Sequence, residues 1–232
     1  KTFEGLPRKP ESNITQRHMD LAASIQKVVE RIIIKIVKKL KDETQLDNLC
    51  LAGGVALNCV VNGLINKHKI FNNIWIQPAS GDAGGALGAA LLVYYHALDR
   101  PREISKSTLP DLMKGGFLGP SFSNKDVENA LKNIGARFQK YDFEEVLNIT
   151  VKKISEGNAI GWMQGKMEFG PRSLGSRSIL ADPRIKDMQK KLNLKIKYRE
   201  SFRPFAPSIV EEDLKDWFDL DIASPYMLLV DK

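Results

Sequence analysis

A β-turn-α unit occurs twice between residues 48 and 98, and no other pattern limits the possible folds of this chain so strongly. In each unit an apolar run, NLCLA or NIWIQP, leads into a glycine-rich turn and then into a helix-forming segment. This order is typical of buried parallel strands joined by helices. The sequence therefore predicts an α/β fold, with strands at 48–52 and 73–78 and helices at 56–68 and 85–98.

A long amphipathic helix is expected before the first unit, over residues 17–41. Thr15 or Asn13 precedes it as a possible N-cap, and its C-terminal end is rich in lysine, which suits the helix dipole. Its apolar residues recur at helical spacing, which indicates a face turned to the core. They are Leu21, Ile25, Val28, Val29, Ile32, Ile36, Val37 and Leu40.

The second half begins after residues 100–121, which lack periodicity and are interpreted as a linker and domain boundary. A short strand is expected in GFLGP, residues 116–120. A helix follows over 124–134 with Ser123 as its cap, and another in DFEEVLNITVKKISEG ends at Gly157. AIGWMQ and SILA are predicted to be strands.

The cysteines and the hydropathy pattern indicate the cellular compartment in which the chain is expected. Cys50 and Cys59 are interpreted as reduced, buried thiols of a cytoplasmic protein rather than as disulfide partners or metal ligands. No apolar stretch reaches the roughly 18 residues of a membrane span. Because the chain starts at Lys1 and ends just after the apolar run PYMLLV, we expect it to be an internal piece of a longer protein.

The positive charge lies in one window. Lys and Arg exceed Asp and Glu by seven over the whole chain, and by the same seven, eleven against four, between Lys166 and Arg203. Such an excess indicates an anion-binding surface. We expect these side chains to fold inward around a single cavity that binds phosphate groups. A solvated basic face and a nucleic-acid surface are the alternatives.

The pattern inside this window favours an ordered pocket, because its cations alternate with Gly, Phe and Pro rather than with other polar residues. Guanidinium groups bind phosphate bidentately, and lysine adds a compact charge. Alternating cations would share one face of a strand. The residues concerned are Arg172 and Arg177 around a glycine-containing loop, and then Lys195, Lys197, Arg199 and Arg203.

The two glycine-rich turns are the candidate ligand sites of the first half. Gly53 and Gly54 lie between a strand and a helix, where glycine lets a ligand approach the backbone and free N–H groups attract anions. Asn58, one turn into that helix, is placed to bind a nucleotide. Asp82 follows Gly81 at a strand end, where a carboxylate suits a cation or a ribose. A tight packing turn at Gly53 and a helix N-cap at Asp82 are the alternatives.

Four motifs together carry a resemblance to a known family. EFGPRSLGSRSILADPR followed by NLKIKYRESFRPFAP closely resembles the C-terminal-domain signature of the O-carbamoyltransferases, which include the nodulation-factor, cephalosporin and tobramycin carbamoyltransferases. LAGGVALN and ASGDAGGALGAAL resemble the end of the N-terminal domain of that family. The resemblance covers nearly the whole chain.

The resemblance implies two domains. Residues 1–105 would form the C-terminal half of an actin-like, ribonuclease-H-like ATPase-type domain, similar to the tRNA threonylcarbamoyl transferase, in which the carbamoyl group is transferred. Residues 106–232 would form the first part of an α/β domain that is similar to threonylcarbamoyl-adenylate synthase.

The resemblance also implies a reaction. Carbamoyl phosphate and ATP, with Mg²⁺, would give carbamoyl-adenylate in the second domain. The carbamoyl group would then pass to a hydroxyl of a sugar, an antibiotic or a lipo-oligosaccharide, near a metal that is typically Fe²⁺. The enzyme would be cytoplasmic, with a homo-oligomer open as an option. Parts of both sites would lie outside this chain, so we expect the chain to be inactive alone.

The motifs that carry the resemblance also imply roles for individual residues. Asp82 would be a metal ligand, with the histidine ligands upstream of Lys1. The other roles that the resemblance implies are catalytic for Lys197, Arg199, Arg172 and Arg177, substrate- and phosphate-binding for Lys166, Arg203 and Lys195, and nucleotide-binding for Gly53, Gly54, Asn58 and Gly81.

Two other functions are alternatives to carbamoylation of a small molecule. A tRNA-modifying protein of the threonylcarbamoyl type would use the basic window to bind nucleic acid, with a steep dependence on salt. A hydrogenase-maturation carbamoyltransferase shares both modules, but there the synthase-like module comes first.

Overall fold

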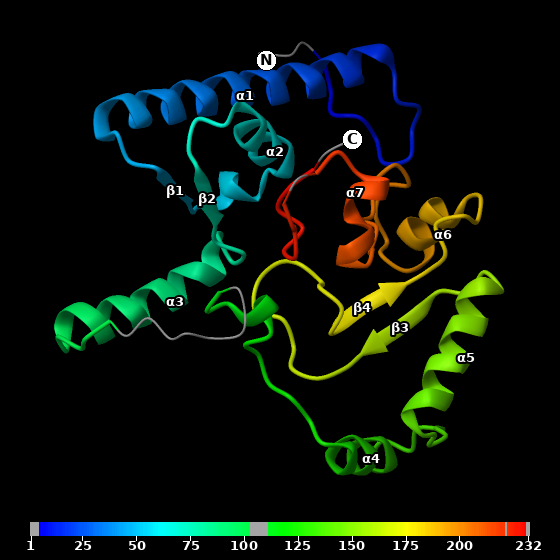
Figure 1. Cartoon of the computed structure of the whole chain (residues 1–232). Helices are drawn as coiled ribbons and strands as arrows, with labels where there is room; N and C mark the ends of the chain where they lie inside the picture. Colours follow the sequence, from blue (N-terminus) through cyan, green and yellow to red (C-terminus); the bar gives the residue numbers. More distant parts are fainter. Residues whose placement is uncertain (1–4, 103–110, 221, 231–232) are drawn as a thin grey trace.

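The computed structural model describes residues 5–102, 111–220 and 222–230. The predicted α/β class is confirmed, whereas the actin-like and synthase-like assignments stay predictions (Figure 1). The predicted boundary at 105/106 and part of the linker at 100–121 lie outside the described residues.

The elements are α1 (Gln16–Thr44), β1 (Asn48–Leu51), η1 (Gly54–Leu57), α2 (Cys59–His68), β2 (Asn73–Ile76), α3 (Asp82–Leu92), the π-helical turn η2 (Val93–Ala97), η3 (Lys114–Gly116), α4 (Asn124–Asn133), α5 (Phe143–Ser155), β3 (Ile160–Met163), β4 (Arg177–Leu180), α6 (Met188–Lys195), η4 (Glu211–Asp213) and α7 (Leu214–Trp217).

The first half is built around the parallel pair β1–β2, which α2 connects. Asn48 pairs with Asn73 at the start of the register, and their side chains are joined by an Nδ2–H to Oδ1 hydrogen bond of 2.8 Å. Parallel strands need such a crossover because their hydrogen bonds cannot form across a tight hairpin. Both predicted strands and both predicted helices of this half are therefore confirmed, with boundaries shifted by a few residues.

Helix α1 lies along α2 and the β1–β2 pair. It starts after Thr15, whose backbone N–H donates to Nδ1 of His18 at 3.1 Å, and it ends at Gln45 in the left-handed conformation. The predicted apolar face is only partly correct, because α1 has apolar residues around more than one side. The core takes Val29, Ile33, Ile34 and Val37, while the exposed side carries Ile25, Val28, Ile32, Ile36 and Leu40.

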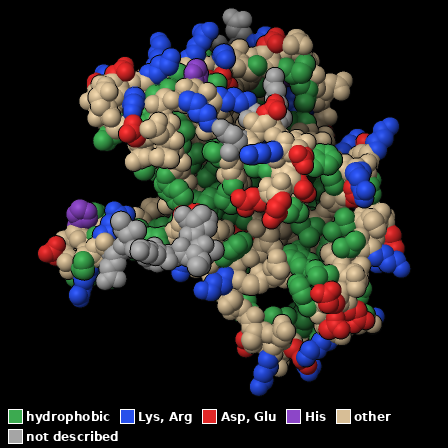
Figure 2. All heavy atoms as spheres, in the orientation of Figure 1, with side chains coloured by type: hydrophobic (Ala, Val, Ile, Leu, Met, Phe, Trp, Pro, Cys, Tyr) green, Lys and Arg blue, Asp and Glu red, His purple; other side chains and the backbone are tan. Residues whose placement is uncertain are grey.

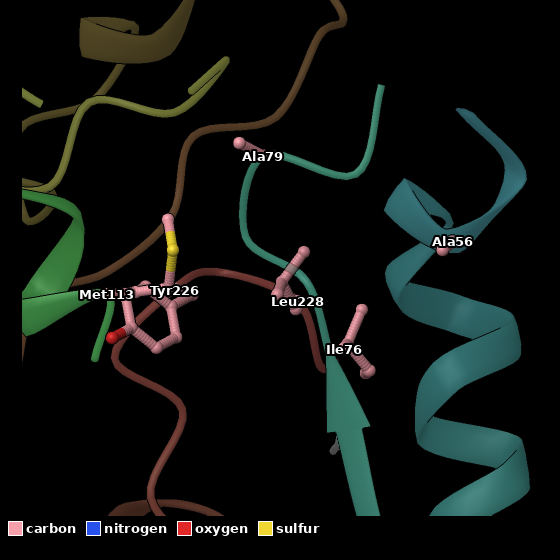
Figure 3. Close-up of a cluster of buried hydrophobic side chains, with 6 residues drawn as sticks. All are labelled: Ala56, Ile76, Ala79, Met113, Tyr226 and Leu228. Atoms are coloured by element: carbon pink, nitrogen blue, oxygen red, sulfur yellow. The ribbon is translucent and has the colours of Figure 1, made fainter. Parts of the chain in front are cut away.

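Two apolar clusters hold the fold together. One joins α1, β1 and α2 through Val37, Leu49, Val61, Ile65 and Phe71. Burial of a side chain such as Ile65, which is fully inaccessible, contributes roughly 1.5–3 kcal/mol. Figure 3 shows the other cluster, in which the C-terminal segment lies beside β2 and the turn after it. Its buried members are Ala56, Ile76, Ala79, Met113, Tyr226 and Leu228.

The C-terminal segment ties the two halves together. Its trace passes between the first half and the β3–β4 pair in Figure 1. Nδ2 of the buried Asn62 donates to the carbonyl of Leu228 at 2.9 Å. The hydroxyl of Tyr226 donates to the Asp111 carboxylate, at 2.8 and 2.7 Å from its two oxygens, and accepts from the backbone N–H of Gly115. Burial and the neighbouring Asp111 raise the pKa of Tyr226 to about 12.

The second half contains the antiparallel pair β3–β4, with α5 in contact with β3. The predicted cap of α4 is confirmed, since Oγ of Ser123 accepts from Asp126 N–H, and Asp142, which was not predicted as a cap, caps α5 in the same way. The helix through DFEEVLNITVKKISEG ends just before Gly157, which has a φ of 84°. Helical propensity and local capping were sufficient to place these two elements.

Two strand predictions in this half are wrong. GFLGP is not a strand, although Gly119 N–H donates to the Met167 carbonyl at 2.9 Å and Met167 N–H donates to Pro120. The alternating cations of NLKIKYR are not in a strand either, because α6 extends to Lys195 and a turn follows. The Lys197 N–H returns to the carbonyl of Leu192 at 2.9 Å, which closes the helix end.

Neither cysteine forms a disulfide, but the prediction that both are buried is wrong, because Cys50 is exposed and Cys59 is only half-buried. In β1 the buried positions alternate, so Leu49 faces the core and Cys50 faces outward. None of the helices among the described residues has the length and apolar character needed to cross a lipid bilayer.

Candidate functional site

The two glycine-rich turns of the first half lie against each other. Gly53 has a φ of 95°, which favours glycine, and its N–H donates to the carbonyl of Ser80 at 2.8 Å. Gln77 N–H bonds to the carbonyl of Leu51, which extends the β1–β2 pairing up to the turns. The predicted ligand turns therefore form one continuous rim at the carboxyl ends of two parallel strands, where α/β sheets bind ligands.

Asp82 is the first residue of α3, and Gly81 is the N-cap. The alternative of an Asp82 N-cap is therefore wrong. Its carboxylate is exposed and makes no hydrogen bond or ion pair with a described residue, but it lies where the helix dipole favours negative charge. The turn needs glycine at Gly84, because a Cβ there would lie 2.1 Å from the carbonyl oxygen of Ala79.

A metal role for Asp82 stays a prediction. No group of three or more His, Cys, Asp or Glu side chains is arranged to hold a metal ion within the described ranges. The described residues alone do not make a set of ligands for Fe²⁺, so we derive no step of the reaction through a metal.

Asn58 is engaged in the fold itself. It is not one turn inside α2, as its sequence position suggested, but caps that helix: its Oδ1 accepts from Val61 N–H at 3.2 Å. Its Nδ2 donates to Oε1 of Gln26 on α1 at 2.9 Å. A contact between Asn58 and a nucleotide would have to compete with these two hydrogen bonds, and it stays a prediction.

A buried carboxylate organises the first cationic loop, which we define as residues 166–177 and call the Glu168 loop. Glu168 is 8% exposed, and its Oε1 accepts from the backbone N–H groups of Leu174, Ser176 and Arg177 at 2.8, 2.9 and 3.2 Å. Burial raises the pKa of Glu168, but the backbone donors outweigh burial and leave that pKa below its usual value. The loop is therefore wrapped around a negative charge.

The Glu168 loop reaches the two glycine-rich turns. Nη2 of Arg172 donates to the carbonyl of Leu57, in the first turn, at 3.3 Å. Gly170 packs on the second turn, since a Cβ added there would lie 3.5 Å from Cα of Ala79, and its φ is 127°. Residues that are more than 90 positions apart in the sequence thus meet where the Glu168 loop contacts the two glycine-rich turns. We call this contact region the junction.

Three buried polar atoms at this junction have no hydrogen-bond partner. They are Oγ of Ser80, Oε2 of Glu168 and Nε of Arg172, and no other side-chain nitrogen or oxygen among the described residues is both buried and unpaired. Buried polar groups are nearly always paired, and leaving one unpaired costs roughly 1–3 kcal/mol. Each such atom calls for an explanation, and contact with a bound ligand or ion is one.

A second cationic loop, residues 196–205, is organised by an amide instead, and we call it the Asn193 loop. The Asn193 side chain is fully buried, and its Nδ2 donates to the carbonyls of Ser201 and Arg203 at 3.1 and 2.8 Å. Its Oδ1 accepts from Nε of Arg199 at 2.6 Å. The Arg199 guanidinium also lies 4.9 Å from the ring centre of Phe205, at cation–π distance.

The N-terminal segment covers the Asn193 loop from outside. Oε1 of Glu11 accepts from the backbone N–H of Ser201 at 3.1 Å, and the Arg8 guanidinium lies 5.8 Å from the ring centre of Phe202. Arg203 is occupied by Glu200, at 2.8 Å. This loop is thus bound to a different part of the first half from the Glu168 loop.

The expectation that the cations from Lys166 to Arg203 surround one cavity is not met. Figure 2 shows Lys and Arg spread around the outline of the molecule. Lys166, Lys195, Lys197 and the Arg177 side chain are exposed and pair with no described residue. A hollow of about 340 Å³ lies elsewhere, at the end of α3, and it is lined by Gly88, Leu91, Leu92, Tyr95, His96, Arg100 and Arg102.

Local pairing explains part of this dispersion. The Arg184 side chain bonds to both oxygens of the buried Asp182 carboxylate, with its Nη2 2.6 Å from Oδ2. These hydrogen bonds hold the pKa of Asp182 at about 2. Arg184 is therefore used by the fold, and charge counts along the sequence cannot separate such pairs from free cations.

Sequence reasoning missed Glu168 and Asn193, the two residues that hold the loops. A signal exists for Glu168, because it is the only acidic residue between Lys166 and Arg177. A lone carboxylate inside a basic, glycine-rich loop indicates an internal acceptor for backbone N–H groups. Asn193 has no such signal, since an asparagine between two leucines also suits a solvent-facing helix position.

Comparisons with known proteins match both halves. A family model described as the carbamoyltransferase N-terminus matches residues 3–91, and one described as the carbamoyltransferase C-terminus matches residues 151–232. An uncharacterized protein of Synechocystis sp. is 53% identical over 229 residues, which is 97% of this chain and 37% of that protein. The nodulation proteins NolNO of Sinorhizobium fredii and NolO of Bradyrhizobium diazoefficiens are each 41% identical over 207 residues, covering 89% of this chain. The chain spans 29% of the former and 36% of the latter.

Proposed function

Because the chain belongs to the carbamoyltransferase family, we propose that the protein transfers a carbamoyl group from carbamoyl phosphate to a hydroxyl acceptor with ATP as the activating reagent. The chain spans about a third of the length of these curated relatives, so we propose this reaction for the full-length protein rather than for the chain alone. One observation carries the proposal: Arg172 of the Glu168 loop meets the two glycine-rich turns at a junction with unpaired buried polar atoms.

Activation of the carbamoyl group is the first step of the proposed reaction. Carbamate is a poor electrophile, and it gains a good leaving group as carbamoyl-adenylate. Carbamoyl phosphate first loses its phosphate with water to give carbamate, whose oxygen attacks the α-phosphorus of ATP, and pyrophosphate leaves. Charge builds on the α-phosphate oxygens, where preorganised cations stabilise the transition state. We assign this role to Arg199 with Lys197, because Asn193 and Phe205 already fix the Arg199 guanidinium.

Transfer is the second step. The acceptor hydroxyl attacks the carbamoyl carbon, the bond to AMP breaks, and the hydroxyl proton is lost to a base. We place this step at the junction, where the Gly53 and Gly81 turns present backbone N–H groups and Arg172 supplies a positive charge for the departing AMP phosphate. The acceptor class that the family resemblance implies is a hydroxyl of a sugar, an antibiotic or a lipo-oligosaccharide.

The test is to incubate the full-length gene product with ATP, Mg²⁺ and carbon-labelled carbamoyl phosphate, and then to offer a panel of sugars, oligosaccharides and aminoglycosides. We expect label on at least one hydroxyl acceptor, with one AMP formed for each carbamoyl group transferred. Absence of transfer to every acceptor, together with absence of AMP, would refute the proposal. AMP without transfer would keep the activation step and move the search to other acceptors.

The alternative of a tRNA-modifying protein is not favoured. The two matching family models are described as the carbamoyltransferase N- and C-terminus, and the NolNO and NolO relatives are nodulation proteins. Arg184, Arg199 and Arg203 are also bound to local partners, so these three arginines are not free to line a phosphate backbone.

A further inference from the structure

The geometry points to Glu168 as a positioning residue for the proposed transfer: we infer that its carboxylate sets the shape of the Glu168 loop and so holds Arg172 at the glycine-rich turns. This inference rests on the proposed function for the reaction involved. It adds a residue that touches neither substrate nor cofactor, and whose effect passes entirely through the backbone of its own loop.

The hydrogen bonds of Glu168 define the loop over its full length. One oxygen gathers three backbone N–H groups that lie six, eight and nine residues further along the chain. Three donors on one carboxylate oxygen are charge-assisted bonds, which are stronger than neutral ones. They force the chain between Glu168 and Arg177 into a closed turn, and Arg172 lies near the middle of that turn.

Neighbouring contacts leave the loop no other anchor of this kind. Phe169 N–H donates to the carbonyl of Gly116 at 2.7 Å, which fixes the entry of the loop, and β4 begins at Arg177, which fixes its exit. Between these points, the Arg172–Leu57 bond is long at 3.3 Å. Without the carboxylate, the loop would depend on that bond, on the bond from Gly175 N–H to Oγ of Ser178, and on the bonds that Gln164 donates to the carbonyls of Ser176 and Gly175 near the loop exit, none of which involves a charged acceptor.

A direct chemical role for Glu168 fits the structure less well. Its Oε1 already accepts from three backbone donors, and these donors hold the pKa of Glu168 below its usual value, so this oxygen serves the loop as an acceptor rather than the reaction as an acid. The length of the side chain is what the geometry requires, because all three N–H groups are reached by one oxygen. Glutamine preserves that reach and one acceptor oxygen, whereas aspartate is one methylene shorter.

The test compares Glu168→Gln, Glu168→Asp and Glu168→Ala with the wild type in the full-length protein, with Glu156→Gln on an exposed helix end as the matched control. Two quantities are measured for each: hydrogen-exchange protection of the amides of Leu174, Ser176 and Arg177, and kcat for carbamoyl transfer. We expect Glu168→Ala to lose roughly tenfold or more in both, with KM for ATP changed less than about twofold.

The order of the three Glu168 variants in amide protection and in kcat decides between the possible roles. If Glu168 is a positioning residue, Glu168→Gln retains most of the protection and most of kcat, and the aspartate and alanine variants lose both together. A Glu168→Gln variant that keeps amide protection but is as inactive as Glu168→Ala would overturn the inference, because the charge itself would then act in the reaction. Loss of stability with an unchanged kcat per folded molecule would also overturn it.

The hydrogen-exchange measurement and the activity measurement test this inference and the proposed function separately. If the wild type transfers no carbamoyl group, the proposed function fails, and with it the placement of Glu168 in that reaction. The exchange arm reports on the loop alone: unchanged protection of the three amides in Glu168→Ala would refute the organising role whatever the activity of the wild type.

Discussion

The Glu168 loop and the Asn193 loop each present an arginine, but different chemistry holds them in place. A buried carboxylate with charge-assisted bonds to three backbone N–H groups holds the first. A buried neutral amide, which bonds two carbonyls and the Arg199 guanidinium, holds the second. The residue that anchors the first loop therefore titrates, whereas the residue that anchors the second does not.

The loops also differ in what they contact. The Glu168 loop meets the glycine-rich turns through Arg172 and Gly170, and the Asn193 loop meets the N-terminal segment through Ser201 and Phe202. A cationic window that looks uniform in the sequence is thus two sites with separate supports. This division suggests that activation and transfer are separable by mutation, and the experiments below test that separation.

The largest effect is expected from removing the neutral anchor. Asn193→Ala deletes three hydrogen bonds from a fully buried position and leaves the Ser201 carbonyl without this donor, while the Arg203 carbonyl keeps only Gln189, so the free energy of unfolding should fall by about 3 kcal/mol. Urea denaturation measures this, with Asn124→Ala on the surface of α4 as a control. A loss below about 0.5 kcal/mol would show that the amide does not hold the loop.

Arg199→Ala should act on activation. If the guanidinium stabilises the charge on the α-phosphate, carbamoyl-phosphate-dependent AMP formation should fall by roughly a hundredfold or more, as for other preorganised donors. Arg199→Lys should recover little, because lysine lacks the planar fork that stacks on Phe205 and bonds to Asn193. Lys190→Ala, on the exposed side of α6, is the matched control. AMP formation at the wild-type rate in Arg199→Ala would remove Arg199 from the mechanism.

Arg172→Lys should act on transfer instead. The substitution keeps the charge but shortens the reach to the Leu57 carbonyl, so we expect carbamoyl transfer to fall about tenfold while AMP formation changes less than about threefold. Both products are quantified in one chromatographic assay. Equal losses of AMP and of carbamoylated acceptor would contradict the division of labour between the two loops.

Mild acid should loosen one loop and not the other. The folded pKa of Glu168 is lowered, so its carboxylate contributes stability that is present above the unfolded value of about 4.5 and is lost as pH falls below it. A protonated Glu168 still offers one acceptor oxygen, as the glutamine of Glu168→Gln does, so amide protection at Leu174, Ser176 and Arg177 should decrease only modestly below about pH 4.5, relative to amides of the Asn193 loop. Glu168→Gln should remove this dependence, and its persistence in that variant would assign the effect to another carboxylate.

The smallest effect is expected at the exposed ion pair of the Asn193 loop. Arg203 and Glu200 are three residues apart at the surface, where such pairs contribute little. Glu200→Gln should leave the urea midpoint unchanged within error. A clear shift would mean that the loop depends on this pair as well as on Asn193.

The sequence was sufficient for the elements that depend on local chemistry. Ser123 at the start of α4 and Gly157 after the end of α5 placed these helices, and apolar runs with glycine turns placed β1 and β2. It was insufficient where tertiary contacts decide the outcome: the exposed side of α1 is as apolar as the buried side, and the alternating Lys195 and Lys197 lie at a helix end.

The residues that support the candidate site could not be predicted from the sequence. The family resemblance implies catalytic roles for Arg172 and Arg199, which stay predictions, and neither motif indicates that Glu168 and Asn193 hold these arginines. A buried polar residue is defined by partners distant in space, such as the backbone N–H groups that converge on one Glu168 oxygen. Periodicity and charge counts carry no information on such convergence.

Carbamoyl activation is the central claim, and AMP formation by the wild-type, full-length protein tests it most directly. The protein is incubated with ATP and Mg²⁺, with and without carbamoyl phosphate, and AMP and pyrophosphate are measured over time. The account predicts that both appear only when carbamoyl phosphate is present, in equal amounts. Neither product forming, or AMP appearing at the same rate without carbamoyl phosphate, would contradict it.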